Sequence, residues 1–338
     1  NHIQMSYYFM FVILFFVGAY FEDAYKKKEL PHFFKASGVL ALAAVVGVCI
    51  NISNLYHTYE YSKETMRGKS ELKQEGAAAS QTSSGLDRDY ITNWSYGIGE
   101  TLTLLVPNVK GGGSGSTMSQ SEAAMSKANP MYNGIYSQLP QYFGEQPWTA
   151  GPVYVGAFVM FLFVLGCFIV KGPLKWALLG ATIFSILLSW GKNFMGLTDF
   201  FIDYVPMYNK FRAVSSILVI AEFTIPLLAI FALKEILSKP DMLKQEKNCR
   251  GVIAALVLTA GVALILAVAP GVFFSSFITT QEMTALKQAL PAEHLAPFVA
   301  NLTEMREAII ASDAWRSFFI IVIGCLFLFL YQLRKLKA

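Results

Sequence analysis

Seven continuous apolar runs, separated by polar or aromatic connections, dominate the pattern of this chain. Each is about long enough to cross the roughly 30 Å hydrocarbon core of a bilayer as an α-helix. Continuous runs predict helices, because the strands of a membrane barrel would alternate apolar and polar residues. The runs cover residues 5–21, 33–55, 152–170, 176–190, 213–233, 251–269 and 317–333. The sequence therefore predicts an all-α polytopic membrane protein with about seven transmembrane helices in one membrane domain, 1–338.

Composition narrows the class of protein further. Residues of the set AVILMFWYC make up 54% of the 338 residues, charged residues make up 15%, and the mean hydropathy is +0.46. Soluble domains carry about 25% charged residues, so an ordinary water-soluble enzyme is excluded. The 27 Phe and 16 Tyr exclude a disordered chain. A net charge of +4 is too small to predict a nucleic-acid partner.

The positions of the basic residues orient the predicted helices. Of the 27 Lys and Arg residues, 14 lie in the three short connections and the C-terminal tail. Short cytoplasmic loops carry an excess of Lys and Arg, so these parts are predicted to lie in the cytoplasm. The long segments 56–151, 191–212 and 270–316 are then predicted to lie outside. The chain enters its first helix without a signal peptide, so we expect earlier transmembrane helices before Asn1.

The first outer segment, 56–151, contains an aromatic, glycine-rich part. Aromatic rings prefer the membrane interface, so residues 140–152 form either an interfacial belt that leads into the next helix or a platform for a sugar or lipid head group. The candidates for stacking on a sugar are Trp94, Tyr96 and Trp148. The run at 111–116, Gly-Gly-Gly-Ser-Gly-Ser, is either an engineered linker or a native flexible turn.

The segment 191–212 is too apolar for a solvated loop and too charged to span, which predicts a re-entrant or interfacial helix. Thr198 is a candidate N-cap, and Pro206 would end the helix. Asp199 and Asp203 are four residues apart and share a helical face. Three cations flank them: Lys192, Lys210 and Arg212. This set suits either an anionic head group beside a proton acceptor or an ion-pair belt that anchors the loop.

Glu222 is the only acidic residue within the seven apolar runs. A carboxylate inside a membrane span is costly unless it is paired or wetted, which favours a cavity or pairing role over a protonated helix contact. Glu100, in the aromatic part of the first outer segment, is a second candidate for a cavity.

The segment 270–316 is predicted to form an outer helical hairpin that begins near Thr280 and is broken at Pro291. Its acidic residues are interpreted as a solvated face rather than a metal site, and they are Glu293, Glu304, Glu307 and Asp313. The four His do not cluster in the sequence, and none of the four Cys lies in the long polar segments, so the sequence predicts neither a His metal site nor a disulfide framework. No cofactor is evident, and a divalent metal has no support.

Several stretches together resemble the YfhO family of bacterial membrane proteins, which is assigned to the GT-C glycosyltransferase superfamily. They are NHIQ at 1–4, WSYGIGET at 94–101, GEQPWTAGP at 144–152, WGKNF at 190–194, TDFFID at 198–203 and PMYNKFR at 206–212. The resemblance implies an enzyme of the bacterial cytoplasmic membrane that transfers a sugar from a polyprenyl-phosphate donor to a glycan or lipid acceptor of the cell envelope. It also implies an acidic residue that acts as the catalytic base in an outer loop before Asn1.

On that interpretation, the cations Lys192, Lys210 and Arg212 contact the donor phosphate. Asp199 and Asp203 are the catalytic candidates, which would orient the sugar or a metal ion. Two other functions stay open at this point. One is a flippase or transporter of lipid-linked sugars, which Glu222 and Pro226 would suit, and the other is a non-catalytic membrane scaffold.

Overall fold

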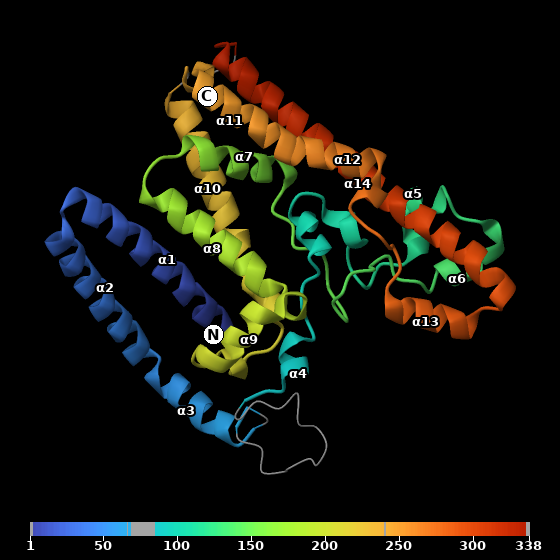
Figure 1. Ribbon diagram of the computed structural model, residues 1–338, viewed down its shortest axis with the longest axis horizontal. Coiled ribbons are helices and arrows are strands. Elements are labelled where there is room, and N and C mark those ends of the chain that lie inside the picture. The colour runs from blue at the N-terminus through green and yellow to red at the C-terminus, as the bar shows by residue number, and fades with distance from the viewer. Residues whose placement is uncertain (1–2, 66, 69–84, 240, 336–338) are drawn as a thin grey trace. The chain divides into compact units, whose positions relative to one another are not determined.

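The computed structural model describes residues 3–65, 67–68, 85–239 and 241–335. This part of the chain is all-helical and contains no strand (Figure 1). It divides into two compact units, and each is described by itself. Unit 1 comprises Asn1–Ser95 and Lys171–Ala221, and unit 2 comprises Tyr96–Val170 and Glu222–Ala338.

Unit 1 is built around α1, which packs along α8. A short turn after α1 sends α2 back antiparallel beside it (Figure 1). The α-helices of this unit are α1 (Ile3–Lys27), α2 (Leu30–Ile50), α3 (Ile52–Lys63), α4 (Arg88–Thr92), α8 (Pro173–Ser189) and α9 (Met195–Tyr204). Its 3-10 helices are η5 (Gly191–Phe194), η6 (Tyr208–Lys210) and η7 (Val214–Leu218).

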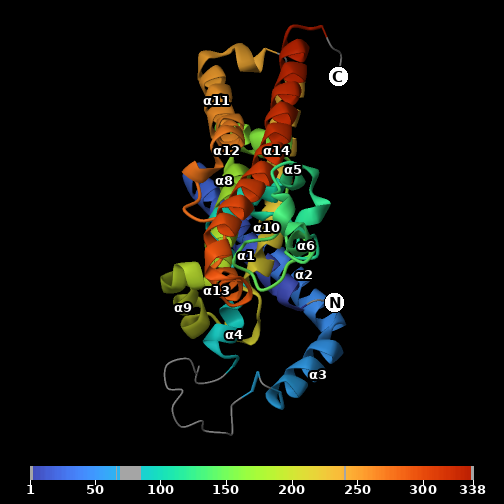
Figure 2. The ribbon, with the colours of Figure 1, turned by 90° about the vertical axis from the view of Figure 1, so that its right-hand side faces the viewer.

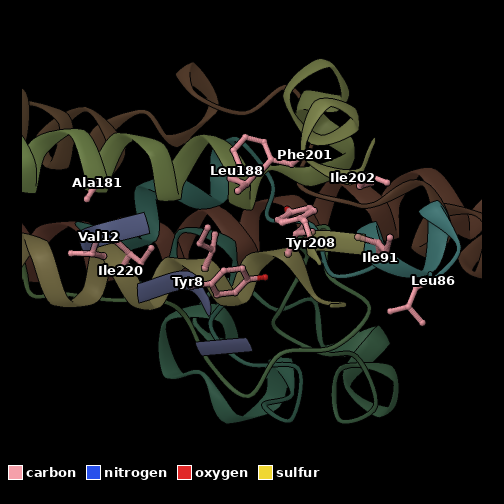
Figure 3. Close-up of a cluster of buried hydrophobic side chains, with 12 residues drawn as sticks. Tyr8, Val12, Leu86, Ile91, Ala181, Leu188, Phe201, Ile202, Tyr208 and Ile220 are labelled. Carbon is pink, nitrogen blue, oxygen red and sulfur yellow. The ribbon is translucent and has the colours of Figure 1, made fainter. Parts of the chain in front are cut away.

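The core of unit 1 is an apolar cluster that joins segments far apart in the sequence (Figure 3). Tyr8 of α1, Ile91 of α4 and Leu188 of α8 are each at most 1% exposed there. Phe201 of α9 and Tyr208 of η6 pack into the same cluster. The cluster therefore fixes the segment 191–212 against the ends of α1 and α8.

Unit 2 has an apolar helical half and a loop-rich half. Its longer helices are α7 (Ala157–Ile169), α10 (Val219–Ser238, which begins in unit 1), α11 (Glu246–Leu256), α12 (Val262–Val268), α13 (Thr280–Ala289) and α14 (Ala292–Gln332). A π-helix, η9 (Val257–Gly261), joins α11 to α12. The short elements are η1 (Gly99–Leu104), η2 (Pro107–Lys110), η3 (Met118–Gln120), α5 (Glu122–Met125), η4 (Pro130–Tyr132), α6 (Asn133–Tyr136), η8 (Met242–Lys244) and η10 (Pro270–Val272).

Helices that could cross a membrane are confirmed, whereas their predicted number is not. Within the described ranges, five helices have the length and composition to span, and they are α1, α2, Val214–Ser238, Glu246–Val268 and α14. The fourth predicted run, α8, bends by 108° into Gly191–Tyr204. The third is shorter than predicted, because the helix begins only at Ala157, after Gly156 at φ +99°. Seven crossings stay a prediction.

The structure has a helical hairpin at α13 and α14, with one difference from the prediction, and its place outside the membrane stays a prediction. Thr279 caps α13 by accepting a hydrogen bond from the Glu282 N–H at 3.2 Å, and α13 ends before Pro291. The second arm does not stop before the last apolar run, because α14 continues through both as one helix of 41 residues. Figure 2 shows α5 and α6 beside the N-terminal half of α14, where they share an apolar cluster.

The glycine run at 111–116 is an ordered turn of unit 2. Gly111 and Gly112 have φ of +82° and +80°, a region that favours glycine. A Cβ at Gly111 would lie 1.9 Å from the Gln141 carbonyl oxygen, so the close backbone approach also requires glycine. Ser114 N–H then donates to the Thr149 carbonyl at 2.9 Å. The run is therefore part of the fold of the aromatic segment.

Candidate functional site

The bend between α8 and α9 is held by the end of the aromatic segment. Gly191 adopts φ +46° at the bend, and a Cβ there would lie 2.1 Å from Ser95 Oγ. Ser95 Oγ accepts a hydrogen bond from the Lys192 N–H at 2.9 Å, and Thr198 Oγ1 donates to the Gly191 carbonyl at 2.9 Å. Because Trp94 directly precedes Ser95, its position relative to the bend is fixed. The chain bends by 108° here, which fits either a broken span or a re-entrant segment, so the predicted re-entrant or interfacial helix stays a prediction.

Helix α9 itself differs at one end from the prediction. It begins at Met195, three residues before Thr198, so the predicted N-cap is wrong, and Thr198 instead ties the first turn to the bend. The helix ends at Tyr204, two residues before Pro206, as the restriction on residues preceding proline predicts.

Asp199 and Asp203 share a partner that the sequence did not suggest. Arg88 of α4 pairs with Asp199 and, through Nη2, with Asp203 at 2.7 Å. The two carboxylates therefore do lie on one face of α9, and they keep one net negative charge after pairing. Their side chains are 44% and 43% exposed, so both remain accessible. A separation of more than 110 residues left no local signal for Arg88.

Arg212 lies on an aromatic surface. Its Nη1 donates to the Tyr90 hydroxyl at 2.7 Å, and its guanidinium lies 5.7 Å from the Tyr90 ring centre and 5.9 Å from that of Trp94. These cation–π contacts hold the planar group without using its remaining N–H donors. Gln4 Nε2 donates a hydrogen bond to the Arg212 carbonyl at 2.7 Å, which fixes the backbone of Arg212. Arg212 is exposed and can bind an anion with two parallel hydrogen bonds.

The two lysines of the segment 191–212 differ in whether their ammonium groups already have a hydrogen-bond partner. Lys192 is exposed, and its ammonium has no partner among the described residues. Lys210 Nζ donates to the Arg67 carbonyl at 2.7 Å, while Arg67 Nε donates to the Lys210 carbonyl at 2.9 Å. Burial lowers the pKa of Lys210. Lys192 and Arg212 are thus the cations left free to contact a phosphate.

The other predicted residues are Tyr96, Glu100, Trp148 and Glu222, and all four belong to unit 2. Tyr96 is 2% exposed, so its ring cannot stack on a sugar from the surface. Its hydroxyl pairs with Thr103 Oγ1 at 2.5 Å. Trp148 is 59% exposed. Glu222 is exposed in the first turn of α10, within the candidate span Val214–Ser238, and its cavity or pairing role stays a prediction.

Glu100 lies in a small polar hollow of unit 2 and is 1% exposed. Its carboxylate accepts hydrogen bonds from the Tyr142 hydroxyl at 2.5 Å and the Gly97 N–H at 2.6 Å. Burial raises the pKa of Glu100, and these hydrogen bonds oppose that rise. Lys110 lines the same hollow, with its ammonium 4.2 Å from the Phe274 ring centre, and burial lowers its pKa.

In the parts of the chain that are described, no three His, Cys, Asp or Glu side chains form a group that could hold a metal ion. The side chains in unit 1 offer two kinds of chemistry, which are anion binding by Arg212 and Lys192 and hydroxyl binding by the Asp199 and Asp203 carboxylates. Comparison of the chain with protein-family models, curated proteins and solved structures finds no match.

Proposed function

We propose that this membrane protein is a GT-C-type glycosyltransferase related to the YfhO family, which transfers a sugar from a polyprenyl-phosphate donor to a cell-envelope glycan or lipid. The observation that carries the proposal is the Arg212 guanidinium, held on the rings of Tyr90 and Trp94 beside the bend at Gly191. Its free donors suit the phosphate of a lipid-linked sugar. The resemblance of the segments at 94–101 and 190–212 supports the same activity.

The transfer makes defined demands on this site. The bond between the sugar C1 and the phosphate oxygen breaks, and C1 forms a bond to the acceptor hydroxyl oxygen, whose proton passes to a general base. Polyprenyl phosphate leaves with the bonding electron pair, so fixed cations that face it lower the barrier. Arg212 supplies two donors for the phosphate, and Lys192 supplies a second positive charge. Asp199 and Asp203, oriented by Arg88, accept hydrogen bonds from sugar hydroxyls.

The membrane arrangement is part of the proposal. The donor would bind at the outer face of a bacterial cytoplasmic membrane, with the short basic connections and the C-terminus in the cytoplasm. The five helices long enough to span, together with α7 and the bent pair α8–α9, would make the seven crossings. The excess of Lys and Arg in the short connections supports this orientation.

Transfer of radiolabelled sugar from a polyprenyl-phosphate donor by the full-length protein in proteoliposomes tests the activity. We expect Arg212→Ala to lower kcat/KM by about a hundredfold, because one preorganised donor group is lost. Arg212→Lys should recover only part of the loss, because an ammonium cannot make the bidentate contact. The control is Arg250→Ala, which removes an exposed arginine that pairs with Glu246 on α11.

Three results would contradict the proposal. They are an absence of transfer by folded full-length protein, wild-type turnover by Arg212→Ala, and an equal loss in the Arg250→Ala control. Movement of the lipid-linked sugar between leaflets without bond cleavage would favour the transporter instead. Binding without either reaction would favour the scaffold.

A further inference from the structure

A polar cleft of about 330 Å³ lies in unit 2 and is lined by residues other than those assigned above. One wall is the part of α14 just before the last apolar run, and the other comes from η2, η3, the start of α5 and the chain at Gln141. Its polar lining residues are Asn108, Gln120, Ser121, Gln141, Ser312, Asp313 and Arg316. Small-molecule sites fall in this size range, although most are lined mainly by apolar groups.

Two glutamines of the cleft are fixed by the backbone of one residue. Gln120 Oε1 accepts a hydrogen bond from the Thr117 N–H at 3.1 Å, which leaves its Nε2 as an unused donor. Gln141 Nε2 donates to the Thr117 carbonyl at 2.7 Å, which leaves its Oε1 as an unused acceptor. Thr117 therefore holds one donor and one acceptor in place before any ligand arrives, which lowers the entropic cost of binding.

The opposite wall is also preorganised. Asp313 is 6% exposed, accepts a hydrogen bond from the Asn108 N–H at 2.8 Å and pairs with Arg316 at 2.5 Å. The acidic face predicted for this helix is thus wrong at Asp313, which is buried and paired. In the described part of the chain, the Asn108 side-chain amide and the Ser312 hydroxyl have no hydrogen-bond partner.

We infer that this cleft binds an uncharged hexose unit. Each sugar hydroxyl is both donor and acceptor, and the cleft presents unused donors and acceptors together on fixed side chains. The Asp313–Arg316 pair has no net charge, so the cleft does not select an anion. The cleft has few apolar side chains, so it does not suit a lipid tail. Its place beside the start of the last span suits a sugar carried at the membrane surface.

Saturation-transfer NMR on the full chain in lipid nanodiscs, prepared free of sugar-based detergent, tests this inference. The probes are glucose, galactose, mannose, N-acetylglucosamine, N-acetylgalactosamine and rhamnose, with glycerol as the head-group comparator. We expect at least one sugar to bind with a Kd on the order of millimolar. Ser312→Trp should lower the signal at least tenfold by filling the cleft, and Asn108→Ala should weaken binding severalfold without adding bulk.

The matched control is Glu304→Trp, which places the same indole ring on α14 at an exposed position outside the cleft. A signal that persists in Ser312→Trp, or that falls equally in Glu304→Trp, would overturn the inference. So would an absence of signal from all six sugars, or glycerol saturating as strongly as they do. No donor lipid is present, so the result does not depend on the proposed transfer reaction.

Discussion

The buried ion pair between α13 and α14 gives the sharpest prediction about stability. Arg306 is fully buried, and its two terminal nitrogens each donate to one Glu282 carboxylate oxygen at 2.7 Å. They also donate to the Phe277 carbonyl at 2.7 Å and the Pro140 carbonyl at 3.2 Å. Glu282→Ala leaves a buried guanidinium without a counter-charge. We expect this to cost about 3–5 kcal/mol of local stability.

Native-state thiol labelling measures this cost where it arises. Leu286 of α13 is 5% exposed, so a cysteine placed there reacts only when the hairpin opens. The four native cysteines would first be replaced by alanine. Glu282→Ala should raise the labelling rate of Leu286→Cys by more than about a hundredfold. Glu304→Ala, which removes an exposed carboxylate of α14, is the control and should leave the rate nearly unchanged.

A double-mutant cycle separates the charge effect from lost packing. In an Arg306→Met background no buried cation remains, so Glu282→Ala should cost less than about 1 kcal/mol. If Glu282→Ala costs the same in both backgrounds, the pairing argument is refuted.

Two further predictions concern the other charged groups. Arg88→Ala leaves Asp199 and Asp203 as like charges four residues apart, so labelling of Phe201→Cys should become easier by about 1 kcal/mol, less at high salt. Adding Asp203→Asn should reverse part of that effect, and no change at low salt would contradict it. Burial raises the pKa of Glu100 above its ordinary 4.5. Its contribution to stability is therefore full below pH 4.5 and is lost as the pH rises through the raised pKa of the folded state. Tyr142→Phe removes an opposing hydrogen bond and should raise this pKa further in a 13C NMR titration, whereas an unshifted midpoint would refute the assignment.

Features set by local sequence could be predicted well. The break at Pro291 and the start of α13 near Thr280 depend on residues within one turn, and both agree with the structure to within a residue or two. The shared face of Asp199 and Asp203 follows from helical spacing alone. Apolar runs identified most of the long helices, because hydrophobicity over about 20 residues is itself a local property.

Features set by distant partners could not be predicted. The pairing of Arg88 with α9 and the burial of Asp313 under Asn108 each join segments that only the folded chain brings together. Spacing along one helix predicted that Asp313 lies on a solvated face. The prediction was wrong because no residue near Asp313 in the sequence indicates that η2 covers it. The roles proposed for Arg212 and Lys192 depended on residue type, and the aromatic support beneath Arg212 became visible only in the fold.

The unbroken course of α14 has a consequence for how the chain tolerates insertions. A helix of 41 residues is about 60 Å long, twice the hydrocarbon thickness, and each residue advances the helix by about 100°. One residue inserted between Asp313 and the last apolar run would rotate α13 and the first part of α14 by more than a quarter turn against the rest of that helix. The rotation of the side chains about the axis of α14 is therefore constrained as well as its length. Insertions and deletions should be tolerated better in the loop before α13 than within α14.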